Sequence, residues 1–599
     1  MTSREIRKIF LEFFARHGHK IISSSTLVPA DPTALFTSAG MQQFGSYLAG
    51  EAEPPYRRAT SCQKCFRTSD IDRVGDEFHH TFFEMLGNWS FGDYFKEEAI
   101  KFALELLNSK FQIPNSKLWV TIFKGQGSVP KDNESIKIWQ KNGIPRGKIK
   151  EFGMEDNFWG PVGLTGPCGP NSEIHFDRGI EFQKGKCSLR GCGPNCTCGR
   201  FVEVWNLVFM EYNRTAKGRY VKLPAQNVDT GAGLERLACI LQNKASDYET
   251  DLFLPLIEEI KKLSNQKTFS EQKSSRIIAD HIRGACFLIV DGVLPGKEDR
   301  GYVLRRIIRR AMRYGRLFEM DKNFLIPLAQ LVINQYKDVY PEVESKRNDI
   351  LTVIQKEQEK FTQTLNHGLK EFQKLVQATL EKKKKTLDSK TVFHLYDTYG
   401  FPFELTKELA REKNFKVDEK AFQREFNHHK EISRAGVKKK FGGVGIQEIK
   451  NQKSKIKIIR LHTATHLLQQ ALRNVLGEHV RQAGSDINLE RLRFDFTHPQ
   501  KLSDKEIKKV EEIVNQKIKE NLEVKMEQMP YEQAIKAGTL AFFREKYPKV
   551  VKVFSIGNFS KEICAGPHVG RTGEIGEFKI ISEKSSGSGI RRIKAIVEK

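Results

Sequence analysis

The chain has few cysteines for its length, no long apolar run and fewer acidic than basic residues. Ten cysteines among 599 residues are too few for the disulfide framework of a secreted scaffold. No apolar run reaches the ~18 residues of a membrane-spanning helix, and the start, Met1-Thr-Ser-Arg, lacks the apolar stretch of a secretory signal. These absences lead us to expect a soluble, cytoplasmic protein with no membrane partner.

Basic residues outnumber acidic residues by 99 to 74, which gives a formal net charge of +25 at pH 7. Such a charge favours a polyanionic partner, with nucleic acid first, because Lys and Arg neutralise phosphates whatever the sequence. The alternative is a protein that is generally basic over its soluble surface. The charge alone does not decide between the two.

The length predicts three to four domains. Residues 1–242 mix short helical patterns with apolar strands, which indicates an α+β catalytic domain. Residues 243–435 change to helix after helix, and residues 436–456 are rich in glycine and lysine, which suits a linker. Residues 457–599 are expected to form a further α+β domain.

Several single elements can be predicted within these domains. Apolar positions across 351–380 recur at helical spacing and indicate one long amphipathic helix. Ser503 and Glu506 form a capping-box pattern at the start of another helix. Strands are expected at 118–123, 201–210, 551–556, 577–581 and 591–597.

Four residues that bind metals in other proteins stand in two pairs near the end of the chain. His462 and His466 are four residues apart, so that on a helix they share one face, and Cys564 and His568 have the same spacing. Together they are able to complete a tetrahedral zinc site with nitrogen and sulfur ligands. The first pair alone would be equally consistent with two surface histidines, and the second pair favours the metal.

A Gly/Pro-rich loop (CSLRGCGPNCTCGR) contains a second group, Cys187, Cys192, Cys196 and Cys198. Their thiolates could converge on a second zinc ion without a core of their own. The irregular spacing leaves reduced, unligated thiols as the alternative. Cys62 and Cys65 also have a metal or redox spacing, but no second pair is near, so we interpret it as chance spacing within a strand.

Arginines and aromatic residues of the first domain suit a bound nucleoside triphosphate. Arg67 is able to bind a phosphate in bidentate fashion, and Phe82, Phe83 and Met85 offer faces for stacking a base. Arg236 follows glycines that admit close backbone approach, which suits a second phosphate. Taken singly, such arginines are more often surface ion pairs. The chain has no GxxxxGK[ST] motif, which excludes a P-loop.

These stretches occur in an order that closely resembles the alanyl-tRNA synthetase family over nearly the whole chain. The strings that carry the resemblance are DPTALFTSAGMQQF, HHTFFEMLGNWSFGDYF, GPCGPNSEI, EVWNLVFMEYNR, VDTGAGLERL, ADHIRGACFLIVDGVLP, RGYVLRRIIRRA, LYDTYGFP, HTATHLL and CAGPHV. The resemblance implies a multidomain α+β protein: a class II synthetase antiparallel sheet with flanking helices, an all-helical middle domain and a small zinc-binding editing domain. The implied reaction joins L-alanine to ATP as an adenylate and then passes it to the terminal adenosine of tRNA(Ala).

The resemblance also implies roles for single residues. Arg67 would bridge the α-phosphate and the amino-acid carboxylate, Arg236 would bind the far phosphate of ATP, and Asp229 would pair with the ammonium of alanine. With Mg²⁺ on ATP, these groups would supply positioning and charge neutralisation rather than a nucleophile. The wall of a methyl-sized pocket would consist of Trp159, Asn206, Val208 and Gly231.

The helix expected from Gly301 to Ala311 is rich in arginine, and the resemblance implies that this region reads the tRNA acceptor stem, including a G·U pair. The alternative is a packing helix whose arginines pair with acidic neighbours. Many family members have Asn where this chain has Lys297, so we expect Lys297 or a neighbouring backbone group to replace it. The candidate tRNA-binding residues are Lys297, Arg305, Arg306, Arg309 and Arg310.

A pocket that accepts alanine cannot strongly reject glycine or serine, because one methylene or hydroxyl is worth only about 1–3 kcal/mol. The resemblance accordingly implies a second, hydrolytic site that removes glycine or serine from mischarged tRNA. The family signature there reads CGGTH, so Ala565 and Pro567 are substitutions between the ligands. The zinc ligands of this editing domain would be His462, His466, Cys564 and His568.

Two rivals keep the fold but not this reaction: a tRNA-binding or amino-acid-sensing protein, and a deacylase with an inactive ligase domain. The presence of Arg67, Asp229 and Arg236 disfavours both, because a protein without the ligase reaction would be free to lose them.

The quaternary structure can also be predicted. Residues 436–460 are too few for the β-barrel that usually precedes the editing module, and the chain stops before the usual C-terminal domain, which aids self-association. We therefore predict a monomer whose tRNA affinity depends on the helical domain and the positive field. Sedimentation velocity should give a single species of 68.7 kDa, and a dimer at micromolar concentration would contradict the prediction.

Overall fold

The structure of the chain, a computed structural model, describes residues 1–598 except 30, 32–33, 162, 164, 186, 188–191, 265–271, 429–450, 499, 541–547, 549 and 588–589. Most of the predicted linker, up to residue 450, lies outside the described residues. Its last part was predicted wrongly, because Gln452 to Ile456 already belong to helix α17 (Gln452–Leu476). No helix in the described part of the chain is long and apolar enough to cross a membrane.

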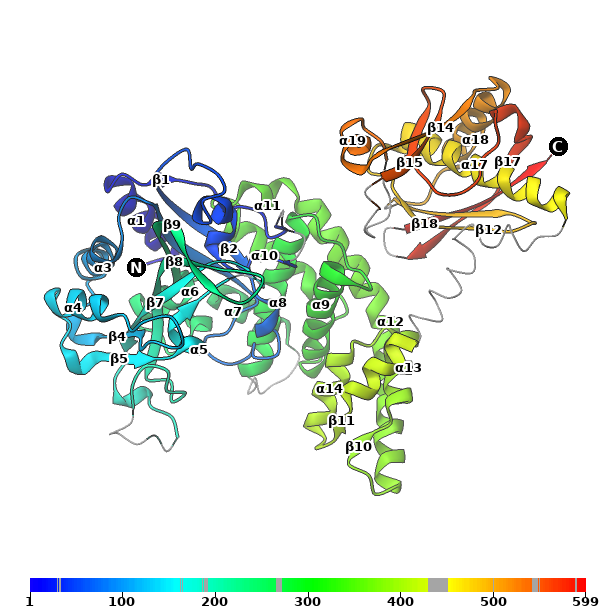
Figure 1. Cartoon of the computed structure of the whole chain (residues 1–599). Coiled ribbons are helices and arrows are strands. Elements are labelled where there is room, and N and C mark those ends of the chain that lie inside the picture. The colour runs from blue at the N-terminus through cyan, green and yellow to red at the C-terminus, as the bar shows by residue number, and fades with distance from the viewer. Residues whose placement is uncertain are drawn as a thin grey trace. The chain divides into compact units, whose positions relative to one another are not determined.

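A nine-stranded sheet forms the centre of the first half of the chain (Figure 1). Its order is β1-β2-β3-β9-β8-β7-β4-β5, with β6 beside β7, and all pairs are antiparallel except β1–β2 and β4–β5. The expected antiparallel sheet is thereby confirmed. The strands are β1 (Lys20–Ile21), β2 (Arg58–Phe66), β3 (Phe82–Phe91), β4 (Leu118–Phe123), β5 (Ile149–Phe152), β6 (Phe158–Trp159), β7 (Gly166–Asp177), β8 (Phe201–Arg214) and β9 (Tyr220–Gly233).

Helices flank this sheet, and from α7 as far as α14 the described chain is helical apart from one short strand, β10 (Thr386–Leu387). The long helix expected across 351–380 is confirmed as α12. The helices are α1 (Ser3–Arg16), α2 (Gly45–Leu48), α3 (Lys96–Glu105), α4 (Asn133–Lys141), α5 (Met154–Asn157), α6 (Leu234–Leu241), α7 (Leu254–Leu263), α8 (Gln272–Val290), α9 (Asp299–Leu317), α10 (Leu325–Tyr336), α11 (Pro341–Ser345), α12 (Arg347–Glu381), α13 (Ser389–Tyr399) and α14 (Phe403–Glu412).

A buried charge network connects the sheet to helices that are distant in sequence. Arg7 of α1 donates to both carboxylate oxygens of Glu84 on β3, at 2.8 and 2.5 Å, and the hydroxyl of Tyr340 donates to the same carboxylate at 2.8 Å. Arg283 of α8 lies 3.8 Å from Glu84 and pairs with Glu235 of α6. Such pairs hold elements in place because either partner left alone would be a buried, uncompensated charge.

The chain divides into two compact units, one of Met1–Glu371 with Tyr399–Leu405 and one of Phe372–Thr398 with Thr406–Lys599. The first unit merges the predicted catalytic domain with most of the predicted helical domain. The physical reason is the packing of α8 on β3, where Phe287 stacks on Phe82 with ring centroids 4.0 Å apart. A domain boundary at residue 242 is therefore not supported.

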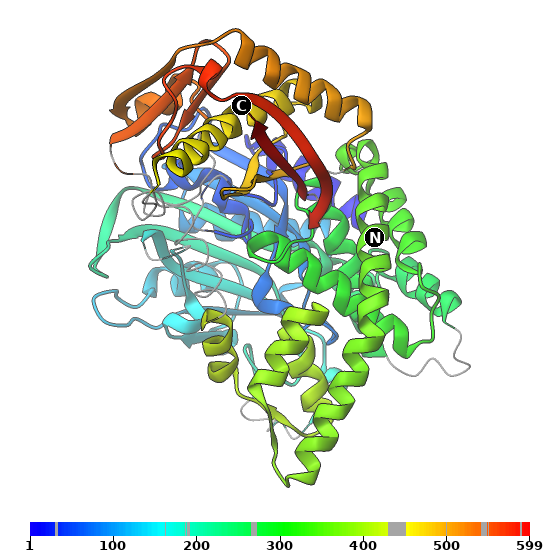
Figure 2. The same ribbon diagram turned by 90° about the vertical axis from the view of Figure 1, so that its right-hand side faces the viewer.

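The second unit contains three further sheets, of which one is only the short pair β10–β11, together with several helices. A four-stranded sheet, β12-β13-β18-β17, shares an apolar core with α17 and α18, and β14-β15-β16 form a separate sheet. Ser503 caps α18 through the predicted capping box with Glu506. The strands β17 and β18 are drawn in red in Figure 2. The elements are β10 (Thr386–Leu387), β11 (Lys416–Val417), β12 (Gln482–Ile487), β13 (Leu492–Thr497), α18 (Asp504–Lys519), β14 (Val524–Pro530), α19 (Tyr531–Lys536), β15 (Val550–Ile556), β16 (Ser560–Ile563), β17 (Glu577–Gly587) and β18 (Ile590–Glu598).

Candidate active site and metal centres

The register of three central strands gathers the predicted alanine-site residues. Asp229 on β9 lies between Trp89 on β3 and Val208 on β8, and Gly231 lies opposite Asn206. Residues directly opposite each other in an antiparallel pair share a face, and so do residues two apart along one strand. Residues from three separate parts of the sequence thus form neighbouring rows on one surface.

A cavity of about 120 Å³ lies over these rows. It is lined by nine of the residues predicted for catalysis or substrate binding: Arg67, Phe83, Met85, Trp159, Asn206, Val208, Asp229, Gly231 and Arg236. The prediction was wrong for Phe82, which was also expected to offer a stacking face but is fully buried and stacks on Phe287 instead. A β-strand explains the difference, because successive side chains point to opposite faces.

Asp229 is a deeply buried carboxylate of this cavity. Its side chain is 6% exposed, and the indole N–H of Trp89 donates to it at 2.6 Å. Burial raises the pKa of Asp229 to about 7, although the hydrogen bond from Trp89 acts in the opposite direction. Within the described chain no ion pair compensates this carboxylate, so the site is suited to a small cation that binds from the cavity.

The two predicted phosphate-binding arginines border the same cavity. The guanidinium of Arg67 lies over the Phe83 ring, 4.7 Å from its centroid, and its Nε donates to the backbone oxygen of Ser38 at 3.2 Å. Arg67 therefore already occupies one position over the Phe83 ring, where we expected a base to stack. Arg236, in the first turn of α6, forms a 2.9 Å ion pair with Glu203.

Glu203 is a cavity residue that the sequence analysis missed. It lines the cavity together with its partner Arg236. Burial opposes its charge, yet Arg236 lowers the pKa of Glu203 below its ordinary value. The available signal was a single carboxylate inside the mostly apolar strand FVEVWNLVFM, because an acid in a buried strand needs a partner.

The size of the cavity depends on Gly231. A Cβ at this position would lie 2.7 Å from Sδ of Met85, closer than side chains pack. The absence of a side chain at Gly231 therefore leaves room beside Met85, and a larger residue would take part of the space that a substrate needs.

The second predicted site, in the second unit, is also brought together. α17 presents His462 and His466, and the turn after β16 presents Cys564 and His568, with all four ligand atoms within 4.8 Å of one another. Nε2 of His462 lies 3.2 Å from Sγ of Cys564, and the Nε2 atoms of His466 and His568 are 2.9 Å apart. This set of one thiolate and three imidazoles fits zinc.

The electrostatics of this centre favour the metal-binding form of the cysteine. Burial opposes the thiolate, but hydrogen bonds from the three histidines lower the pKa of Cys564 to about 2. Gly566 makes the turn between the ligands possible, because a Cβ there would lie 2.5 Å from Nε2 of His462. Gly566 is thus the residue between the ligands whose size the structure constrains most directly.

Glu562 supports this centre and was not predicted from the sequence. Its carboxylate lies 2.6 Å from Nδ1 of His466, on the side of the ring opposite to the ligand nitrogen. Burial acts against the charged imidazole, but Glu562 outweighs it and raises the pKa of His466 to about 10. A carboxylate in this position orients a metal-binding imidazole and makes it a stronger ligand.

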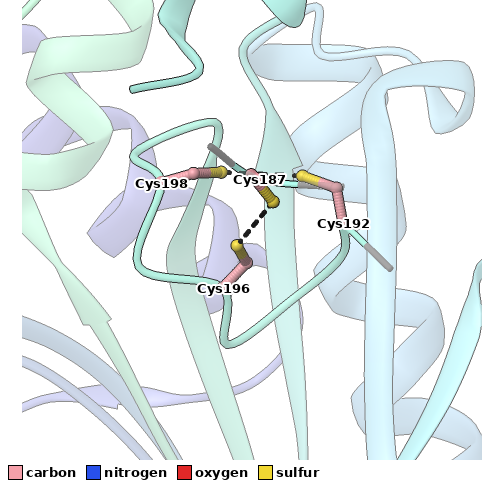
Figure 3. Close-up of side chains that lie close together, drawn as sticks. All are labelled: Cys187, Cys192, Cys196 and Cys198. Carbon is pink, nitrogen blue, oxygen red and sulfur yellow. Dashed lines mark hydrogen bonds between the residues drawn. The ribbon is translucent and has the colours of Figure 1, made fainter. Parts of the chain in front are cut away.

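The four cysteines of the loop also converge (Figure 3). Their sulfur atoms lie within 4.8 Å of one another, with Cys187 and Cys196 3.3 Å apart and Cys192 and Cys198 3.6 Å apart. Cys62 and Cys65 both lie in β2, Cys65 fully buried, which agrees with our interpretation of their spacing as that of a strand.

Arg309 and Arg310 do not form the expected RNA-binding face. Arg309 is 2% exposed, pairs with Glu357 at 2.6 Å and donates to the backbone oxygen of Gly400. Arg310 is 5% exposed and donates to the backbone oxygen of Ile71 at 2.9 Å. The alternative of a packing helix with paired arginines is therefore the one that the structure supports for both residues.

The remaining candidates of this region differ from one another. Arg305 is buried, with its guanidinium 5.6 Å from the centroid of the Tyr302 ring, and Arg306 pairs with Asp72 at 2.6 Å. Burial excludes Arg305 from a phosphate-binding surface, so the prediction is wrong for it, whereas the Arg306 side chain is 13% exposed beside the exposed Asp72 and stays a candidate. Lys297 is exposed just before α9 and stays a candidate.

The position of Glu562 leads to a prediction about metal affinity. Glu562→Gln should lower the zinc affinity of the His/Cys centre by roughly 10- to 100-fold, because the imidazole loses its charged partner. Competition with a chromophoric chelator measures this, and Glu577→Gln, an exposed carboxylate of the same unit, is the control. Equal affinities for the two variants would contradict the supporting role of Glu562.

Comparisons with known proteins agree with this geometry. The family described as tRNA synthetases class II (A) matches residues 5–482, and the family described as threonyl and alanyl tRNA synthetase second additional domain matches residues 551–594. An apo histidyl-tRNA synthetase structure from S. aureus is 13% identical, covers 46% of this chain and 83% of its own, and has a TM-score of 0.27, which is too low to support an argument.

Curated relatives match over the full length. The alanine–tRNA ligase of Borrelia hermsii is 47% identical over 100% of both chains, and that of Treponema pallidum is 47% identical over 99% of this chain and 98% of its own. The alanine–tRNA ligase of Dehalococcoides mccartyi is 40% identical over 99% of this chain but 80% of its own. The chain therefore belongs to the alanyl-tRNA synthetase family of class II tRNA synthetases.

Proposed function

We propose that the chain attaches L-alanine to tRNA(Ala) in two steps and removes wrongly attached serine or glycine at a separate zinc centre. The observation that carries the first part is Asp229, a buried carboxylate without a cationic partner in the described chain, in a cavity that also contains Arg67 and Arg236. This arrangement matches an amino acid whose ammonium meets the carboxylate and whose own carboxylate meets an arginine.

In the first step, a carboxylate oxygen of alanine attacks the α-phosphorus of ATP. A phosphorus–oxygen bond forms, the bond to the β-phosphate oxygen breaks, and pyrophosphate leaves. Arg67 neutralises the α-phosphate and Arg236 the far phosphates, while Asp229 fixes the ammonium end. Mg²⁺ would enter with the ATP phosphates, and Glu203 is the cavity carboxylate nearest to Arg236 that is able to contribute to its binding.

In the second step, a ribose hydroxyl of the terminal adenosine of tRNA attacks the carbonyl carbon of the adenylate. An ester bond forms, the bond between the acyl carbon and the phosphate oxygen breaks, and AMP leaves with the bonding electron pair while the hydroxyl proton passes to AMP or to solvent. We propose that tRNA meets the enzyme partly through exposed Lys297 and partly through the general positive charge. The enzyme is proposed to act as a monomer in the cytoplasm, where its substrates meet.

The editing proposal is supported by His462, His466, Cys564 and His568, whose ligand atoms lie within 4.8 Å of one another. When bound there, zinc would supply a Lewis acid or a fixed point for the tRNA end. Gly231 keeps the alanine cavity open beside Met85, and size alone discriminates serine from alanine too weakly for accurate translation. A second site that hydrolyses the ester of the wrong amino acid compensates for that.

Alanine-dependent exchange of pyrophosphate into ATP tests the ligase directly. The full chain should catalyse it with alanine and, less efficiently, with serine, whereas Gly231→Ala should raise the KM for alanine because its Cβ enters the cavity. Deacylation of seryl-tRNA should then fall when a chelator removes zinc, while exchange with alanine persists. Well-folded protein without exchange activity would contradict the ligase proposal.

The burial of Asp229 predicts a pH dependence. Below a pH of about 7 the carboxylate of the free enzyme takes up a proton, and the ion pair with the alanine ammonium is lost. Hence kcat/KM for alanine should fall as the pH decreases through this value, tenfold per unit below it. Trp89→Phe removes the hydrogen bond that lowers this pKa, so the fall in kcat/KM should then begin at a higher pH.

Asp229→Asn provides the matched variant. It should lower kcat/KM for alanine by roughly 10²- to 10³-fold, the cost of breaking a buried charge pair. It should also abolish the fall of kcat/KM at low pH. The KM for ATP is the internal control, because Asp229 does not contact the phosphate-binding arginines. If kcat/KM of the Asn variant still fell at low pH in the same way, the pH dependence would belong to another group.

A further inference from the structure

The loop that contains Cys187, Cys192, Cys196 and Cys198 has the geometry of a metal cage. In a tetrahedral zinc site with Zn–S bonds of about 2.3 Å, the sulfur atoms are about 3.8 Å apart. The sulfur atoms here are separated by 3.3 Å and 3.6 Å in two pairs, and by at most 4.8 Å overall (Figure 3). A disulfide would need about 2.05 Å, so the sulfur atoms are spaced as four ligands rather than as two bonds.

The described residues of this loop contribute little to an apolar core. It joins the short 3₁₀ helix Ile180–Phe182 to β8, and three of its four cysteines are only half-buried. Its described backbone contacts include Lys184 N–H to the oxygen of Cys198 at 2.8 Å and Cys196 N–H to the oxygen of Gly193 at 3.1 Å. A segment with so little core is the kind that a structural metal holds in one conformation.

Four thiolates and one divalent ion together have a net charge of −2, which nearby cations would stabilise. Two cationic side chains lie near the cluster. Arg200 follows the loop directly and lies within electrostatic reach of Cys192 and Cys198. Cε of Lys150 lies 3.8 Å from the place that a Cβ of Gly193 would take. These two cations reduce the cost of collecting four negative sulfur atoms.

The same loop forms one wall of a second cavity, of about 620 Å³. Residues Asn195 to Gly199, two of the cysteines among them, line it. The lining also includes four cationic side chains, Arg73, Lys184, Arg236 and Arg276, and three acidic ones, Asp76, Glu77 and Glu203. Arg236 and its partner Glu203 also line the smaller cavity described above, which makes the loop a neighbour of the residue expected at the far phosphates of ATP.

We propose that Cys187, Cys192, Cys196 and Cys198 bind a second, structural zinc ion, which fixes residues 195–199 as a wall of this second cavity beside Arg236. The metal site itself is independent of the ligase reaction. Its effect on the ATP-binding side of the cavity rests on the function proposed above, and the two parts have separate measurements.

Elemental analysis of the full-length protein, purified under reducing conditions, tests the metal site. Two zinc ions per chain are expected, and Cys192→Ser/Cys198→Ser should retain one, at the His/Cys centre. Cys239→Ser, which keeps a hydrogen bond to the backbone oxygen of Lys244, is the control and should retain both. One zinc per chain in both the unmodified protein and the double variant would overturn the proposal.

A second measurement does not depend on the folding of a variant. Cobalt(II) substituted into the unmodified protein should give the intense thiolate-to-cobalt charge-transfer absorption of a four-thiolate tetrahedral site, far stronger than a centre with one thiolate produces. Mass spectrometry of the denatured, non-reduced protein tests the alternative. Disulfides Cys187–Cys196 and Cys192–Cys198 in place of a metal would overturn the proposal.

Pyrophosphate exchange tests whether residues 195–199 influence ATP binding beside Arg236. The double variant should raise the KM for ATP by about tenfold, because misplacing groups beside Arg236 by even a fraction of an ångström weakens phosphate binding, and should leave the KM for alanine unchanged. Loss of one zinc without any change in the KM for ATP would overturn the role of the wall. Absence of exchange in the unmodified protein would instead count against the proposed ligase and leave the metal count standing.

Discussion

The alanine site depends on the backbone pairing of β3, β9 and β8. Their hydrogen bonds place Trp89, Asp229 and Val208 in one row and Asn206 opposite Gly231 in the next. A slip of one residue in either pairing would turn Asp229 away from the cavity, because side chains alternate between the faces of a strand. The chemistry of a single carboxylate is thus set by the register of a large sheet, which the antiparallel neighbours on both sides hold in place.

Two carboxylates of the site, Glu203 and Asp229, differ in whether they have a cationic partner within the described chain. Arg236 keeps a carboxylate partner, Glu203, at 2.9 Å, whereas Asp229 receives only the neutral indole of Trp89. A paired charge is stable in the empty protein, and an unpaired one is costly unless a ligand supplies the counter-charge. The contrast explains why Asp229 has a raised pKa while Glu203 does not, although both line the same cavity.

Much of this site follows from sequence patterns, and the remainder depends on long-range packing. Apolar stretches predicted the strands at 118–123 and 201–210, and four-residue spacing predicted the histidine pair on α17. The partners of functional residues were not predictable, because Glu203 and Glu562 are recognised only when the fold brings them to Arg236 and His466. Composition alone cannot tell a basic surface helix from a buried one.

The arginines of α9 show this most clearly. Their density suggested a phosphate-binding face, yet Arg309 and Arg310 are among the most buried charged residues of the chain. What distinguishes them is the position of Glu357, 48 residues further along, and that of the backbone oxygen of Ile71. Both contacts are long-range, so no local pattern in the helix itself contains them.

The network of Arg7, Glu84, Glu235, Arg283 and Tyr340 has a consequence for the order of synthesis. Its first member is made at residue 7 and its last at residue 340, so the ribosome must release more than half of the chain before the charges of the central sheet are all paired. Until then Glu84 and Glu235 have no complete set of partners, and burying them early would be unfavourable. The sheet is therefore expected to close late, around helices that the sequence alone seemed to assign to another domain.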